Sequence, residues 1–198
     1  MSCAHRALLF LFATLAPMVA RAQAPSPSPA SVLTIDGPRS SASFAVTLRM
    51  RSATQGHLTR VSGQFAGSPA AGWTALVKVD GRNLKVDGPR WMERVTRSDA
   101  FLAVNRHPAI RFESELFSDA VLHAGGILTG KLTLRGLTQP VSFRLLPSEC
   151  DHPGRDCDIH VQGTVSRHAF GMTAYRSMVK DNVDFKFQVR LRAEKTAP

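Results

Sequence analysis

Histidines are the side chains of this sequence best suited to acid–base or metal chemistry. Apart from His5, the histidines are His57, His107, His123, His152, His160 and His168. No two of these histidines have the H-x-H or H-x-x-x-H spacing that lets one strand or helix present two metal ligands. Asp99 and His107 could be combined with a serine into a triad, but the sequence has no G-x-S-x-G nucleophile elbow. We therefore expect no catalytic residue, no metal and no cofactor; a hydrolase that depends on His107 or His168 is the enzymatic alternative.

Two cysteines, Cys150 and Cys157, flank a turn in the segment ECDHPGRDCD. Pro153-Gly154 between them is a turn signal, and two cysteines on either side of a turn favour a disulfide in an oxidising compartment. The alternative is a metal site that adds His152, but the spacing matches no zinc pattern and a fourth ligand is not evident. We expect the disulfide.

Three polar residues at positions 166–168 precede the apolar motif FGM at residues 170–172. Ser166-Arg167-His168 could contact a polar headgroup, although we favour exposure at the surface for them. Met50, Met172 and Met178 could pack against a flexible ligand or fill a core equally well.

The first 22 residues have the pattern of a secretory signal peptide. Arg6 precedes an apolar run over residues 7–16, and Ala20 and Ala22 form an A-x-A cleavage site. The run is too short to span a bilayer, and no later stretch is long and apolar enough to do so. We expect cleavage after Ala22, a flexible Pro/Ser-rich leader over residues 23–31, and one folded domain over residues 32–195.

The formal net charge of the chain is +10, and it falls to +8 when the signal peptide removes Arg6 and Arg21. A basic surface favours transient contact with anionic lipid headgroups or another polyanion, or serves only solubility. Nucleic acid is not expected as a partner, because the export signal points away from it and the basic residues are scattered.

Strands must position the candidate site residues, since apolar and polar side chains alternate along most of the domain. Turn signals separate these runs at residues 67–72, 123–126 and 135–140. About eight such runs predict an all-β, antiparallel, eight-stranded barrel or a sandwich, and a barrel of this size holds packed side chains or one small ligand. The alternating runs cover residues 42–50, 61–65, 73–80, 110–115, 128–135, 141–145, 159–165 and 183–192.

A charged interlude at residues 81–104 interrupts the strands and is too long for a hairpin turn. It predicts a short helical segment near residues 88–104, with Pro89 at its first position and a second N-cap at Ser98-Asp99 that starts another short turn. Trp91, Phe101 and Leu102 could cover one mouth of the barrel, or the interlude could be a solvated crossover without a ligand role.

An outer-membrane barrel would show the same alternation with its apolar face outward. Three features favour a soluble barrel: the chain after the last strand is EKTAP rather than an aromatic end, one Tyr and two Trp are too few for two aromatic girdles, and residues 81–104 do not form a short turn.

Two longer motifs occur in a fixed order: RSDAFLAVNRHPAIRFES at residues 97–114 and GKLTLRGLTQPVSF at residues 130–143. With LTIDGPRSSASFAV before them and FGM ahead of the last strand, the chain resembles the YceI-like family over about residues 32–194. It differs from the common family pattern in carrying Thr47-Leu48 in place of Lys-His, and in the middle motif.

This resemblance implies a periplasmic, lipocalin-like barrel that binds a polyisoprenoid or an isoprenoid quinone in an elongated apolar tunnel, without catalysis. A filled barrel whose basic surface binds a partner is the alternative, and the sequence leaves the lipid, its headgroup and a possible homodimer open. Apolar walls suit a lipid tail, since each buried methylene contributes about 0.8 kcal/mol. The expected lipid-binding residues are Phe44, Val46, Leu48, Trp73, Val77, Trp91, Phe101, Ile110, Phe112, Leu132, Leu134, Phe143, Phe170, Met172, Phe185 and Phe187.

Overall fold

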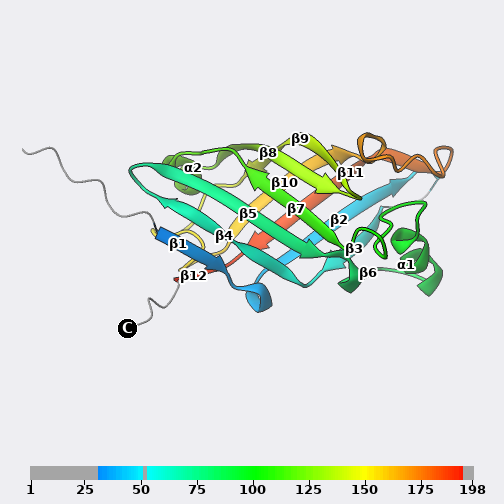
Figure 1. The fold of residues 1–198 in the computed structure, drawn as a ribbon, viewed down its shortest axis with the longest axis horizontal. Helices are drawn as coiled ribbons and strands as arrows, with labels where there is room; N and C mark the ends of the chain where they lie inside the picture. Colours follow the sequence, from blue (N-terminus) through cyan, green and yellow to red (C-terminus); the bar gives the residue numbers. More distant parts are fainter. Residues whose placement is uncertain (1–30, 51–52, 194–198) are drawn as a thin grey trace, which may run out of the picture.

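One antiparallel sheet that curls around an apolar interior makes up the protein (Figure 1). The structure is a computed structural model that describes residues 31–50 and 53–193. The expected signal peptide and all but Ser31 of the expected leader lie outside the described residues. The strand segments are β1 (Ser31–Ile35), β2 (Ser41–Leu48), β3 (Thr54–Leu58), β4 (Val61–Ser68), β5 (Gly72–Asp80), β6 (Leu84–Val86), β7 (Ala109–Ser114), β8 (Gly126–Leu134), β9 (Leu137–Leu145), β10 (Ile159–Ser166), β11 (Val179–Val189) and β12 (Leu191–Ala193).

The twelve segments behave as eight strands, because four of the strands are interrupted. The 3-10 helix η1 (Gly37–Arg39) separates β1 from β2, and η2 (Gly81–Asn83) separates β5 from β6. Residues 59–60 separate β3 from β4, and Arg190 alone separates β11 from β12. The sequence prediction of eight strands thus differs from the observed count of segments, while the all-β antiparallel class is confirmed.

The pairing of these strands returns to its starting point. On one side β11 pairs with β10, and on the other side it pairs with β2, in a register that sets Phe185 opposite Phe44. Beyond Arg190 the chain continues as β12 and pairs with β1, which in turn pairs with β4. This closure leaves few unpaired edges and encloses the inward faces of all the strands.

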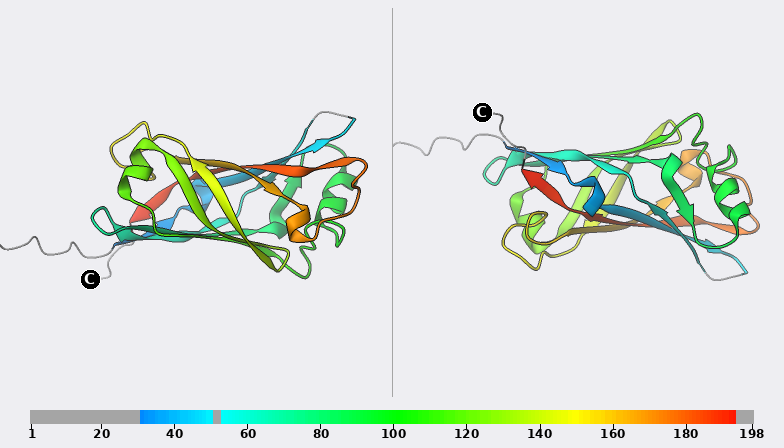
Figure 2. Two further views of the ribbon diagram at one scale, coloured as in Figure 1. Left: turned by 90° about the horizontal axis from the view of Figure 1, so that it is seen from above. Right: turned by 90° about the horizontal axis from the view of Figure 1, so that it is seen from below.

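Short helices lie at the two ends of the barrel. Helix α1 (Arg90–Arg97) and the loop after the 3-10 helix η3 (His168–Phe170) lie at one end, which we call the α1 end (Figure 1). Helix α2 (Asp119–Ala124) and the described ends of β1 and β12 lie at the other (Figure 2). The expected helical segment is therefore present but shorter.

Two features of the helices differ from the expectation, and one agrees with it. Pro89 has an extended backbone and caps α1 instead of being its first helical residue. The short turn expected at Ser98 is present over residues 99–102, because the Ala100 backbone N–H donates to the Ser98 hydroxyl group at 3.3 Å and the Phe101 backbone N–H donates to the Ser98 carbonyl at 3.0 Å. Helix α2 was not expected.

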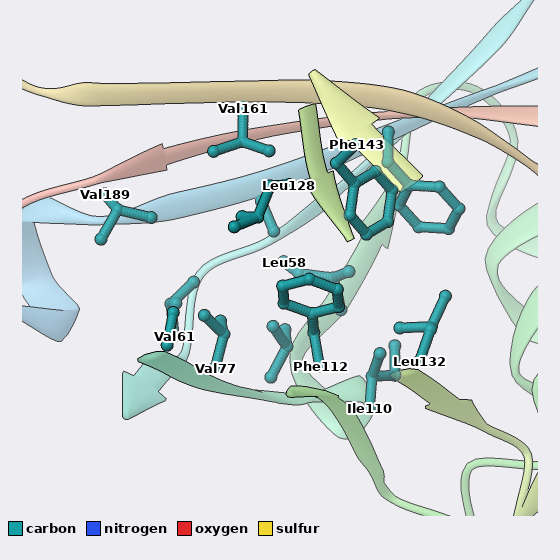
Figure 3. Close-up of a cluster of buried hydrophobic side chains, with 14 of the residues drawn as sticks. Leu58, Val61, Val77, Ile110, Phe112, Leu128, Leu132, Phe143, Val161 and Val189 are labelled. Carbon is teal, nitrogen blue, oxygen red and sulfur yellow. The ribbon is translucent and has the colours of Figure 1, made fainter. Parts of the chain in front are cut away.

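The interior is filled by the apolar residues of the alternating runs (Figure 3). Phe112 of β7 and Phe143 of β9 meet edge to face in the middle of the barrel, with ring centroids 5.2 Å apart. A Cβ atom on Gly163 would lie 2.4 Å from the Phe143 ring, so a glycine at this position of β10 makes room for it. Outward positions of the same strands carry the charges.

The Cys150–Cys157 disulfide is present and closes the loop between β9 and β10, as the sequence predicts. Among the described residues, no helix is both long and apolar enough to cross a membrane.

Candidate functional site

An apolar cavity lies inside the barrel at the α1 end. The space between its lining side chains amounts to about 550 Å³, including the part open to solvent, but only about 50 Å³ can hold the centre of a water-sized sphere. The surface that faces the cavity is apolar. The lining residues are Phe44, Val46, Leu58, Thr96, Phe101, Leu102, Ile110, Leu134, Val165, Ser166, Arg167, Phe170, Met172, Val183 and Phe185.

Many of the residues proposed from the sequence meet at this cavity. They come from β2, β7, β8, β11, the turn after α1 and the segment around η3, because strand alternation turns their side chains inward. The expected lipid-binding residues that line the cavity are Phe44, Val46, Phe101, Ile110, Leu134, Phe170, Met172 and Phe185.

The remaining expected residues lie elsewhere. Val77, Phe112, Leu132 and Phe143 are buried in the packed core, and Phe187 is packed against it. Leu48 is half-buried near the end of β2.

The two tryptophans are not part of the cavity wall. Trp73 is buried in β5 and its indole N–H donates to Asp119 at the start of α2, 2.8 Å away. Trp91 is 58% exposed on α1, which corrects the expectation that it covers the mouth of the barrel. Of the methionines, Met172 lines the cavity, whereas Met50 and Met178 are exposed.

A row of phenylalanine rings runs from the cavity into the middle of the barrel. Phe44 lies 6.2 Å from Phe185, which lies 6.1 Å from Phe187, measured between ring centroids. Phe187 lies 5.7 Å from Phe143, and Phe143 meets Phe112. These rings occupy the space that the resemblance assigned to an elongated tunnel, so the described cavity is confined to the α1 end.

Arg167 is the most unusual residue of the cavity wall, because it is only 2% exposed. Among the described residues it has no ion pair. Its guanidinium donates instead to the carbonyl groups of Met172, Ala174, Val179 and Lys180, at 2.5 to 3.2 Å. Burial lowers the pKa of this guanidinium, while the nearby charge of Asp181 raises it. The surface exposure that we favoured for Arg167 is therefore wrong.

Arg167 ties down the segment that closes the cavity. Its guanidinium carbon lies 5.7 Å from the centre of the Phe101 ring. Tyr175 stacks on the outer side of the site against Phe101, with ring centroids 5.7 Å apart and planes within 10° of each other. Tyr175 has a φ of 55°, a left-handed conformation that is uncommon for a bulky residue. Phe101 and the segment from Met172 to Lys180, which includes Tyr175 and is held by Arg167, together form what we call the lid.

Beside Arg167, the carboxylate of Asp181 organises the neighbouring polar residues. It accepts hydrogen bonds from the Ser166 hydroxyl group at 2.7 Å and the His168 backbone N–H at 2.9 Å, and its Oδ1 lies 3.2 Å from His168 Nδ1. Burial opposes ionisation of Asp181, but these hydrogen bonds and the adjacent positive groups together hold its pKa below the ordinary value. The cluster fixes the start of η3 beneath the lid.

The histidines in the described ranges are distributed over the molecule, and most of them lie beside a single carboxylate. His57, His123, His152 and His168 each lie beside one carboxylate, those of Asp87, Asp119, Asp156 and Asp181 respectively. Within the described part of the chain, no three His, Cys, Asp or Glu residues come together as metal ligands.

Sequence reasoning missed several residues of the site. Val165 and Val183 line the cavity and share the inward parity of their strands, so a stricter use of alternation could have included them. Thr96 of α1 and Tyr175 of the loop after η3 depend on how the helix and the loop pack at the α1 end, for which the sequence carries no signal.

Several solved structures are similar to this chain. BcnA from Burkholderia cenocepacia is 21% identical, with a TM-score of 0.66 over 80% of this chain and 99% of that one. A polyisoprenoid binding domain from Saccharophagus degradans is 12% identical, with a TM-score of 0.61 over 82% of this chain and 98% of its own. The YCEI protein from Campylobacter jejuni is 16% identical, with a TM-score of 0.54 over 71% and 84%. At these identities the likeness shows the fold.

No curated protein sequence matches the chain. A family model does match, and it spans nearly all of the barrel, from Leu33 in β1 to Leu191 in β12. The model is that of the YceI-like domain, and the chain therefore belongs to the YceI-like family.

Proposed function

We propose that this protein binds a long apolar lipid non-enzymatically, with the lipid tail inside the barrel. The observation that carries this proposal is the apolar cavity at the α1 end, which sits under a lid and continues into a row of phenylalanine rings. A lipid tail needs no polar partner there, since burial of its methylenes alone is favourable.

The open part of the cavity is small, so binding of a long tail requires side chains to move. Ligand sites for small molecules measure about 300–1,000 Å³. In this cavity only about 50 Å³ can hold the centre of a water-sized sphere. The rings of Phe185, Phe187 and Phe143 stand one behind the other along the path from the cavity. Rotation of these rings would lengthen the cavity toward the middle of the barrel, and we propose that the tail enters by this route.

An isoprenoid is the tail that we favour, free or as part of a quinone. The support is the family membership of the chain and the similarity of its fold to the polyisoprenoid binding domain. Release from a signal peptide into the periplasm completes the proposal, and the disulfide suits such an oxidising compartment. There the protein would carry, store or protect the lipid and contact anionic membranes transiently.

The proposal is tested by lipid extraction and mass spectrometry of protein purified from cells that export it. The native chain should yield a stoichiometric apolar lipid. Val165→Phe, which fills the cavity, should yield none, whereas Thr164→Phe on the outer face of the same strand should still carry it. Circular dichroism should show that both variants are folded. Ligand-free native protein that also takes up no added polyprenol would refute the proposal.

A filled barrel that serves as an interaction module is the second candidate. The packed rings in the middle of the barrel favour it. It predicts an anionic partner that binds in a salt-sensitive way and no lipid in the extract, so the same experiment separates the two.

A further inference from the structure

Apolar side chains project into solvent at the α1 end, where the lid lies. Trp91 on α1 is 58% exposed, Met178 in the lid 54%, and Met50 after β2 94%. Met50 and Met178 belong to neighbouring segments, because the Arg49 backbone N–H donates to the Met178 carbonyl at 2.8 Å. Figure 1 shows α1 and the segment after η3 at this same end. These large apolar side chains are all exposed at one end of the barrel, which favours a docking surface there.

Positive charge surrounds the same end. A hollow of about 690 Å³ beside α1 is lined by the basic residues Arg82, Lys85, Arg90, Arg94 and Arg97 and by the single acid Glu93. Glu93 pairs with Arg97 at 3.1 Å and Lys85 at 3.8 Å, and Arg82 pairs with Asp80.

Two of these cations have no ionic partner among residues 31–50 and 53–193. Arg90 and Arg94, one turn apart on α1, form no ion pair within the described part of the chain, and neither do Arg49 and Arg176 on the lid side. The end therefore presents uncompensated positive charge around apolar side chains.

We propose that the α1 end docks on the surface of a bilayer that contains anionic lipids. Arg90 and Arg94 would contact the headgroups, and Trp91 would enter the interfacial layer, where an indole ring is favoured. Because Thr96 of α1 and Phe101 line the cavity, docking in this pose sets the lid against the membrane, so a lipid tail could pass between bilayer and barrel without crossing water. This inference deepens the membrane contact of the proposed function by naming its surface.

Vesicle binding tests the surface. The full chain is mixed with vesicles of phosphatidylcholine alone or of phosphatidylcholine with phosphatidylglycerol, and partitioning is measured by sedimentation. Each basic residue near an anionic surface contributes roughly fivefold in affinity, so Arg90→Gln/Arg94→Gln should weaken binding about 25-fold. Lys131→Gln/Arg144→Gln is the matched control, since both residues are exposed on β8 and β9, away from α1, and form no ion pair with any residue that the structure describes; it should bind within about twofold of the native chain.

Tryptophan emission reports the pose. The chain has two tryptophans, and Trp73 is buried, so a blue shift on adding anionic vesicles must come from Trp91. The shift should be absent in Trp91→Phe. Three results would each overturn the inference: no binding of the native chain to anionic vesicles, equal binding of the two double variants, or binding without a shift. Equal affinity for soluble polyglutamate without a shift would point instead to a protein partner. The vesicles contain no isoprenoid, so this result is independent of the extraction experiment.

Discussion

Replacement of Arg167 by Met tests how the buried arginine holds the lid. Two of its hydrogen bonds, to Met172 and Val179, are buried, and the two to Ala174 and Lys180 are partly buried. The substitution removes the hydrogen-bond donor of these four carbonyl groups, and each lost hydrogen bond lowers the stability by about 1 kcal/mol. Part of this loss is offset, because methionine carries no charge that must be desolvated on folding. We expect Arg167→Met to lower the free energy of unfolding by about 3–4 kcal/mol.

The assay is urea unfolding followed by circular dichroism, with hydrogen exchange of the segment from Met172 to Lys180 as the local readout. Arg167→Lys is the conservative comparison. Its ammonium group has three donors on a flexible stem and cannot serve four carbonyl groups in the geometry of the guanidinium fork, so it should recover less than half of the loss. Exchange in the lid should rise in both variants. Native-like stability of Arg167→Met together with unchanged exchange would refute this account of the lid.

Three further outcomes follow from the same structure. Cys150→Ser/Cys157→Ser should lower the free energy of unfolding by about 2.5 kcal/mol, because the unfolded chain gains conformational entropy when its eight-residue loop is no longer closed. An unchanged urea midpoint would contradict this. Phe143→Ala should cost about 3–5 kcal/mol of stability and raise the uptake of a fluorescent apolar probe, since it opens the row of rings; lower uptake would argue against the entry route. For Asp181, a pKa held below its ordinary value of 3.8 contributes stability that is present above that pH and is lost as the pH falls through the lowered pKa. The urea concentration at the midpoint of unfolding should therefore decrease as the pH is lowered below about 4. Asp181→Asn should flatten this part of the plot of midpoint against pH.

The sequence was most informative where a strand is long and one face is buried. The alternation of Val183, Phe185, Phe187 and Val189 predicts β11 and its inward face, because a slip of one residue would expose every one of these side chains. The short segments β1, β3, β6 and β12 were missed or merged. Each continues a neighbouring strand after an interruption, and three to five residues are too few to show a period.

The site was less predictable, since its unusual members depend on contacts between distant segments. Arginine is rarely buried, and two of the carbonyl groups that accept from Arg167, those of Met172 and Ala174, come from a loop whose path no local sequence pattern predicts. Trp91 lies within an amphipathic pattern with Val95, yet the helix is only eight residues long and turns Trp91 to solvent. A barrel filled by phenylalanine rings and a hollow one share the same alternation, so the extent of the cavity could not be predicted either.

The central claim is that a lipid tail lies in the barrel, and a structure determined after incubation with a long polyprenol tests it most directly. The account predicts a chain of density that enters beside Phe101, passes Phe185, and displaces the rings of Phe187 and Phe143 from their present contact. An interior identical to that of the protein without polyprenol, with all of these rings in place, would contradict the account.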